Sequence, residues 1–314
     1  MTFKPRLAYI DYLKCVCIIL MVVFHLVYIS DKYPYIKQLV YTFHMPTFLI
    51  ISGYLANVIK KKRQFTLSIL WIFIPYAIME TGYVLMSSVL PVRESVDNIS
   101  ILFLLDKVFL SPMGPYWYLH TFVVCCLVYY VVDKISARMN NISSFIILGL
   151  CFWILSYWFN IISMANAIYF MIGVVLNRCR LNFLSVFQPS AWALVPLVVL
   201  CAYPTNLNRY SLAGIVITYL FISLFLCAYR YIPEKVKSKM HFVGMNTLPI
   251  LLFSPIFTIL SKALVPLFSF DPSGLIFMCV AVTFVISGCF FISWLMDRMN
   301  LSRYFCGKCN LLIR

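Results

Sequence analysis

The chain has 314 residues, of which 63% are hydrophobic, 17% aromatic and only 11% charged, and its mean hydropathy is +0.94. A soluble globular domain has about 45–50% apolar and about 25% charged residues. These values exclude a soluble enzyme, a disordered chain and a fibrous protein, and they favour a polytopic membrane protein. The apolar segments do not alternate polar and apolar residues, which argues against a single-chain outer-membrane barrel.

The formal net charge of +15 does not indicate nucleic-acid binding. Basic residues lie in short clusters between apolar segments, the pattern by which helical membrane proteins mark their cytoplasmic face. Membrane lipid, and not nucleic acid, is therefore an expected partner. Most of the twelve cysteines lie inside apolar runs, where a free thiol behaves as a small hydrophobe, and they form no disulfide framework. The single Cys-x-x-Cys pair, Cys306 and Cys309, is weak evidence for metal or redox chemistry without a second pair.

A helix needs about 20 mostly apolar residues to cross a bilayer. The first such segment follows Lys4 and Arg6 without a small-residue cleavage site, so we expect an uncleaved first span. The apolar stretch at 99–110 is too short to cross and is expected to lie in the interface or to re-enter. In chain order, the predicted spans are 8–29, 37–58, 66–90, 115–132, 143–160, 162–177, 188–203, 210–229, 242–265 and 274–296.

The distribution of basic residues predicts the orientation. With the N-terminus inside, 18 of the 25 lysines and arginines fall on the cytoplasmic side and two fall within spans. The opposite side holds the remaining five, which are Lys32, Lys37, Arg93, Lys107 and Arg209. The sequence thus predicts an all-α, polytopic protein of about ten transmembrane helices in one bundle, with both termini cytoplasmic and residues 1–314 forming one membrane domain.

The first predicted span carries three ionisable residues, Asp11, Lys14 and His25. Each such group in a bilayer costs at least a few kcal/mol unless it faces a cavity or a partner, so these are candidate functional residues. Eleven residues separate Lys14 from His25, which is three helical turns plus about 20°. Both therefore lie on one face, and Asp11 lies one turn from Lys14, where it can pair with it. The alternatives are that the charged pair snorkels to the headgroups and that His25 only bonds neighbouring helices.

The second predicted span contributes His44, Ser52 and Gly53. His44 is expected at a depth similar to that of His25, so that the two imidazoles could share a site. Ser52 and Gly53 in mid-membrane suit close helix packing or a narrow ligand channel. The basic run at 60–63, which ends in Arg63, is either a topology signal that contacts anionic lipid or a binding site for the phosphates of a nucleotide-bearing donor.

Further polar residues follow in the third and fourth spans. Glu80 requires a partner, for which Lys14 and Lys262 are candidates. Trp117 and His120 belong to an aromatic cluster that is either an interfacial belt or a sugar-stacking surface. The sequence contains no HExxH, P-loop or GxSxG pattern, so it does not predict a metalloprotease, an NTPase or a serine hydrolase, and no metal site is expected.

Together these residues resemble the membrane acyltransferase-3 family, with the closer likeness to its fucose 4-O-acetylase-like branch of sugar O-acetyltransferases. The family's basic-x10-His signature corresponds to Lys14 and His25. The run F-H-M-P-T-F-L-I-I-S-G-Y at 43–54 is the most specific match. Shorter elements match at 115–119 (P-Y-W-Y-L), 169–173 (Y-F-M-I-G) and 244–248 (G-M-N-T-L), in the family's order.

The chain departs from the family pattern at three positions. Lys14 stands where Arg is more usual, which keeps the charge but loses the planar fork. The segment before Pro75 is apolar, whereas relatives often have a basic residue there. The late block reads Ser254-Pro255 where it often ends in His-Pro, so catalysis is expected to depend more heavily on His25.

The resemblance implies an O-acetyltransferase in the cell membrane that uses cytoplasmic acetyl-CoA. The acceptor would be a sugar hydroxyl of a surface polysaccharide or of its lipid-linked precursor. Lys14 and Arg63 would hold the donor's negative charge, with Asp11 positioning Lys14. His25 would be the general base or would carry the acetyl group covalently, and Ser52 or an amide near Gly53 would stabilise the oxyanion. His44, Gly53, Trp117 and His120 are expected to contact substrate.

Two other classes of function remain open at this point. Ten helices with buried ionisable groups also suit a proton-coupled transporter or exporter, although no internal repeat of the kind such proteins use is visible. A non-catalytic scaffold is the third possibility, and it gives no reason for a basic residue and a histidine on one helix face. No oligomeric state follows from the sequence.

Overall fold

The structure is a computed structural model that describes residues 7–58, 61–88 and 99–313. Within these ranges the chain is helical and forms no strand. Of the basic residues counted above, Lys4, Arg6, Lys60, Arg93 and Arg314 lie outside the described residues. The expected all-α class is confirmed for the part of the chain that the structure describes.

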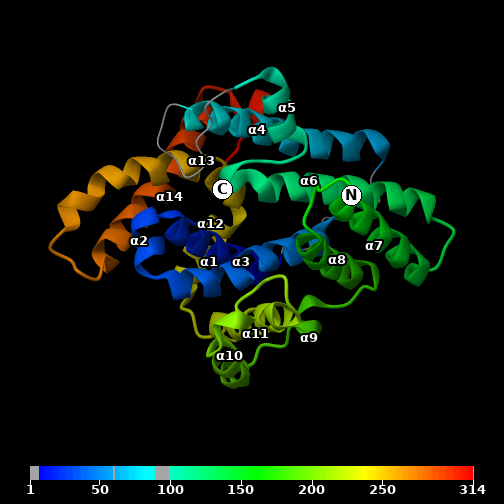
Figure 1. Ribbon diagram of the computed structural model, residues 1–314, viewed down its shortest axis with the longest axis horizontal. Helices are drawn as coiled ribbons and strands as arrows, with labels where there is room; N and C mark the ends of the chain where they lie inside the picture. The colour runs from blue at the N-terminus through cyan, green and yellow to red at the C-terminus, as the bar shows by residue number, and fades with distance from the viewer. Residues whose placement is uncertain (1–6, 59–60, 89–98, 314) are drawn as a thin grey trace. The chain divides into compact units, whose positions relative to one another are not determined.

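The chain divides into two compact units. Figure 1 labels most of the helices that belong to them. Unit 1 comprises Met1–Phe48, Asn182–Asn300 and Asn310–Arg314, and unit 2 comprises Leu49–Leu181 and Leu301–Cys309. Helix α3 (Pro34–Leu55) contributes its residues up to Phe48 to unit 1 and the rest to unit 2.

Helix α1 (Ala8–His25) is the most deeply buried long helix of unit 1 and packs against α2, α11, α12, α13 and α14. Its closest approach is to α12, where a Cβ added at Gly244 would lie 1.8 Å from the carbonyl oxygen of Asp11. Only glycine permits the two backbones to be this close. The other helices of the unit are α2 (Val27–Lys32), α9 (Phe183–Val186), η2 (Ala191–Ala193), α10 (Leu194–Cys201), η3 (Pro204–Asn206), α11 (Leu212–Tyr229), α12 (Glu234–Met245), α13 (Thr247–Leu260), η4 (Ser261–Phe268) and α14 (Leu275–Arg298).

The first predicted span is broken, because Leu26 has an extended backbone (φ −70°, ψ 106°) that separates α1 from α2. The carbonyls that the break exposes have other donors. The amide of Leu26 bonds to Val22 and Val23, and the hydroxyl of Tyr41 donates to the carbonyl of Phe24 at 3.2 Å. Satisfied backbone groups are what allow a helix to be interrupted at membrane depth.

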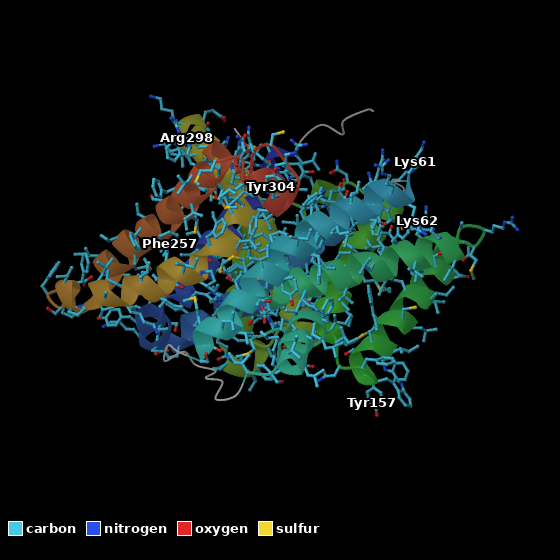
Figure 2. The ribbon with its side chains drawn as sticks, turned by 90° about the horizontal axis from the view of Figure 1, so that it is seen from above. Lys61, Lys62, Tyr157, Phe257, Arg298 and Tyr304 are labelled. Atoms are coloured by element: carbon cyan, nitrogen blue, oxygen red, sulfur yellow. The ribbon has the colours of Figure 1, made fainter. Side chains whose placement is uncertain are left out.

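The predicted span 242–265 also divides, at Asn246, into α12 and α13. Buried Asn246 bonds to both backbone groups of Ile313, donating to its carbonyl at 3.0 Å and accepting from its amide at 2.7 Å. The carboxylate of Asp297 accepts from the amides of Leu311 and Leu312. The C-terminal residues are thereby fixed to α14 and to the α12–α13 junction. Figure 2 labels Arg298 at the end of α14 and Phe257 on α13, which packs beside α14.

Unit 2 is built around a crossing of α3 and α8. A Cβ added at Gly53 would lie 2.0 Å from the carbonyl oxygen of Phe170, and one added at Gly173 would lie 2.0 Å from that of Ile50. The amide of Asn177 donates to the carbonyl of Tyr54 at 2.7 Å and so caps the end of α3. The unit contains α4 (Lys62–Ser87), α5 (Ile101–Phe109), η1 (Gly114–Tyr116), α6 (Trp117–Ile135), α7 (Asn141–Tyr157), α8 (Met164–Arg178) and α15 (Ser302–Cys306).

Six helical segments in the described residues are long and apolar enough to cross a membrane, which supports a multi-pass membrane protein. They are Ala8–His25, Lys62–Ser87, Ile101–Ile135, Leu212–Tyr229, Thr247–Phe268 and Leu275–Arg298. The other four predicted spans correspond to α3 and to three shorter apolar helices, Asn141–Tyr157, Met164–Arg178 and Ala191–Cys201. Ten spans with both ends inside therefore remain a prediction.

The crossing in unit 2 predicts that Gly173→Ala destabilises the protein, because the new methyl group would overlap the carbonyl of Ile50. Overpacking of this kind costs about 1–3 kcal/mol or more. Gly82→Ala is the matched control, since a Cβ there meets no atom within 4 Å and alanine favours the helix by about 1 kcal/mol. Thermal unfolding in detergent should show a lower midpoint for Gly173→Ala only. Equal midpoints for the two variants would contradict the close crossing.

Candidate active site

The three ionisable residues of the first predicted span all lie on α1, in unit 1. The ammonium of Lys14 lies 2.7 Å from the carboxylate of Asp11, with side-chain exposures of 18% and 6%. Breaking a mostly buried ion pair is costly, because the partner that remains is a buried charge without compensation. The Asp11 end of the pair is further fixed by the close contact of its backbone with Gly244.

His25 is the last residue of α1 and is partly buried. Since α1 is continuous from Ala8, Lys14 and His25 lie on one face, about 16 Å apart along the axis. The Nδ1 of His25 lies 2.7 Å from the carbonyl oxygen of Met21. A carbonyl only accepts, so Nδ1 carries the proton and Nε2 is the basic nitrogen of the neutral ring.

His44 has the same arrangement on α3. Its ring is buried, and its Nδ1 donates to the carbonyl of Val40 at 2.6 Å, which again leaves Nε2 as the basic nitrogen. The ring of Tyr41 lies 5.3 Å from that of His44 and 6.4 Å from that of His25, between centroids. Tyr41 is thus a neighbour of both imidazoles within unit 1, and a site shared by His25 and His44 stays a prediction.

The second set of predicted residues lies in unit 2. The hydroxyl of Ser52 is 2.7 Å from that of Tyr118. The ring of Tyr118 stacks on that of Phe122 and lies edge to face with that of Trp117. The α-carbon of Gly53 faces the backbone of α8, so this residue serves the helix crossing. Arg63 is exposed in the first turn of α4, next to Lys61 and Lys62, which Figure 2 labels at that end of the helix.

His120 and Glu80 hold the segment that leads into α6. The Nε2 of His120 lies 2.9 Å from the carbonyl oxygen of Phe109, and the carboxylate of fully buried Glu80 accepts from the amide of Met113 at 2.6 Å. The hydroxyl of Tyr76 donates to the carbonyl of Val108 at 2.9 Å. In unit 2 these side chains bind backbone groups of residues 108–113 and so position the Trp117–Tyr118 pair.

Sequence reasoning passed over several residues of these groups. Tyr41 could have been found from its spacing of three residues to His44, which places both on one side of a helix. Tyr118 carried no signal beyond its aromatic neighbours. Asn166 on α8 is buried, and its side-chain oxygen has no hydrogen-bond partner among the described residues. Such an atom is one that a ligand or water commonly satisfies.

Among the described residues, no three His, Cys, Asp or Glu side chains are grouped so that they could hold a metal ion. Cys306 is buried and Cys309 exposed, and neither is disulfide-bonded.

Comparison with known proteins decides the family. The model of the Acyl_transf_3 family, described as an acyltransferase domain, matches residues 7–294. The chain belongs to the acyltransferase-3 family. No curated protein and no solved structure matches it. Membership of this family supports membrane acyl transfer in general as the activity of the protein. It does not favour the transporter alternative.

The positions at which this acyltransferase departs from its family pattern can now be placed. Lys14, which stands where relatives more often have Arg, forms its ion pair with Asp11 through one ammonium group. Ser254 and Pro255, in place of His-Pro, are buried in α13. In unit 1 the histidines are His25 on α1, His44 on α3 and His241 on α12.

The role assigned to Glu80 predicts a specific local effect in this acyltransferase. Glu80→Ala removes the acceptor for the amide of Met113, and a buried donor left unsatisfied costs about 1–3 kcal/mol. Hydrogen–deuterium exchange should rise in residues 108–116 and remain unchanged in α14. Glu80→Gln, which keeps a carbonyl oxygen near that amide, should show a smaller increase. Unchanged exchange in Glu80→Ala would refute the anchoring role.

Proposed function

We propose that the protein is an integral-membrane O-acetyltransferase that moves the acetyl group of cytoplasmic acetyl-CoA to a sugar hydroxyl. The acceptor would be a cell-surface polysaccharide or its lipid-linked precursor. The observation that carries the proposal is the face of α1 that holds both the Asp11–Lys14 ion pair and a histidine whose Nε2 is basic. Family membership supports acyl transfer.

The likeness to sugar O-acetyltransferases supports the finer part of the proposal. It is carried by the block at 43–54, in which His44 and Gly53 lie. Here His44 would hold the acceptor hydroxyl through its Nε2, since its Nδ1 is engaged by Val40. Trp117 beside Tyr118 is an aromatic surface of the kind that stacks on sugar rings.

The donor would be held at the predicted cytoplasmic end of α1. An ammonium fixed by a carboxylate at 2.7 Å retains further N–H donors for phosphate oxygens. Helix α12, which packs on α1, brings Lys235, Lys237 and Lys239 to the same unit. Donor binding by Arg63, which lies in unit 2, stays a prediction.

The chemistry needs one proton acceptor. As the acceptor hydroxyl attacks the thioester carbonyl carbon, His25 Nε2 takes its proton and a C–O bond forms. The tetrahedral intermediate then collapses, the C–S bond breaks, and the leaving CoA thiolate receives the proton from His25. The products are the sugar acetate ester and CoA with a free thiol. If the acetyl group is relayed covalently, the same Nε2 is the nucleophile.

The assignment of His25 predicts that His25→Ala lowers acetyl transfer at least about a hundredfold, the scale of a lost general base. The readout is mass-spectrometric counting of acetyl groups on surface glycan from cells that express the variant at normal levels. Cells lacking the gene provide the baseline.

The matched control is His241→Ala, because His241 is bonded to the hydroxyl of Tyr229 at 3.0 Å and is given no part in the reaction. This variant should keep near-normal acetylation. Normal glycan acetylation with His25→Ala would remove the proposed mechanism, and unchanged glycan in cells lacking the gene would remove the proposed activity.

The assignment of Lys14 predicts a defect in donor binding. Lys14→Gln removes a charge-assisted contact worth about 1.5–3 kcal/mol and should raise the KM for acetyl-CoA about tenfold or more. Lys14→Arg keeps the charge and the pair with Asp11, and it should stay near the wild-type KM. Lys262→Gln, which removes an exposed lysine of η4, should have no effect. The proposal for Lys14 fails if Lys14→Gln lowers kcat without changing the KM for acetyl-CoA.

A further inference from the structure

The peptide group that joins Phe24 to His25 accepts a hydrogen bond from α3. In a continuous helix the carbonyl of Phe24 would accept from the amide four residues later, but α1 ends at His25 and the chain is extended at Leu26. The hydroxyl of Tyr41 donates to this carbonyl at 3.2 Å. Because a peptide group is planar, the bond fixes a plane that contains the α-carbon of His25. One side chain of α3 thus holds the backbone from which the candidate base extends.

The same tyrosine lies at a fixed spacing from the second imidazole. Tyr41 and His44 are three residues apart within α3, so both project from one side of that helix. The ring of Tyr41 lies 5.3 Å from that of His44 and 6.4 Å from that of His25, between centroids. Tyr41 is therefore tied to His44 by its own helix and to His25 by its hydroxyl.

Each imidazole ring is also oriented by the helix that carries it. The Nδ1 atoms of His25 and His44 lie 2.7 and 2.6 Å from carbonyl oxygens one turn earlier in their own helices. These bonds orient each ring within its helix, but they do not relate the two rings to each other. The bond from Tyr41 to Phe24 joins the two helices at this point and provides that relation.

We infer that Tyr41 is a positioning residue of the transfer reaction, which places the Nε2 of His25 relative to that of His44. This inference rests on the proposed function, in which His44 holds the acceptor hydroxyl and His25 takes its proton. The base must lie within hydrogen-bond reach of that proton. A misplacement of about 1 Å can cost about a hundredfold in rate, so a bond that sets the separation of the two rings matters for catalysis.

The donor end of α1 should be independent of this bond. Lys14 is paired with Asp11 at 2.7 Å, and about 16 Å of helix separates it from His25. Loss of the Tyr41 hydroxyl should therefore lower kcat and leave the KM for acetyl-CoA unchanged. A general loosening of the fold would not divide its effect in this way.

The test compares Tyr41→Phe with Tyr33→Phe in the full-length protein in detergent. Tyr33 is the matched control, because its hydroxyl also donates to a backbone carbonyl of unit 1, that of Ser273 at 2.8 Å, and it is given no part in the reaction. Each variant receives radiolabelled acetyl-CoA and glycan extracted from cells that lack the gene. Tyr41→Phe should lower kcat about tenfold to a hundredfold at an unchanged KM for acetyl-CoA. Tyr33→Phe should keep the wild-type kcat.

A second measurement reports on the helix end without the reaction. Phenylalanine at position 41 keeps the ring between its neighbours and removes only the hydroxyl. Hydrogen–deuterium exchange in Tyr41→Phe should rise at residues 24–27 and remain unchanged in α12. Thermal midpoints of both variants show that they are folded.

The outcomes separate this inference from the proposed function. A wild-type kcat in Tyr41→Phe, an equal loss of kcat in Tyr33→Phe, or unchanged exchange at residues 24–27 overturns the positioning role and leaves acetyl transfer standing. A raised KM for acetyl-CoA at an unchanged kcat overturns it too, because the effect would then act on the donor. If the wild-type protein transfers no label, the proposed function fails and this inference fails with it.

Discussion

The ion pair between Asp11 and Lys14 is the constraint on which the architecture of unit 1 depends. A charge in a membrane-embedded helix is costly unless it is paired, and here the partners are 2.7 Å apart and mostly buried. The pair sits where α1 meets α12 through Gly244, so the helix that carries the cation is fixed at that point by backbone contact. Because α1 is rigid and continuous, fixing this end also fixes His25 three turns away.

The hydrogen bonds at the C-terminal end of α1 serve both the fold and the chemistry of the candidate site. A helix that stops at membrane depth must satisfy its last carbonyls, and here the amide of Leu26 bonds to those of Val22 and Val23. At the same end, His25 donates from Nδ1 to the carbonyl of Met21. This bond orients the ring and selects the tautomer in which Nε2 is basic. Tyr41, which donates to the carbonyl of Phe24, closes the same helix end and lies near both imidazoles. The tyrosine that completes the backbone of α1 is thus also a neighbour of both histidines of the candidate site.

Local features of this site could be predicted from the sequence, whereas long-range ones could not. The alignment of Lys14 with His25 and the pairing of Asp11 depend only on the helical period. The break at Leu26 could not be predicted, because the residues around it are as apolar as the rest of the span and its donors come from α3. Gly53 was correctly read as a site of close approach, but its partner Gly173 is 120 residues away, and the sequence gives no reason to join them. The hydrogen bond of His120 to the carbonyl of Phe109 could not be predicted either, because a backbone acceptor leaves no signal in the pattern of side chains. A substrate contact of His120 stays a prediction.

The distance between cation and base on α1 makes sense for a donor of the CoA type. The phosphates of CoA are separated from its thioester by the long pantetheine arm, so a cation that binds phosphate should lie far from the base that serves the thioester. A spacing of about 16 Å on one helix provides that separation without a flexible element.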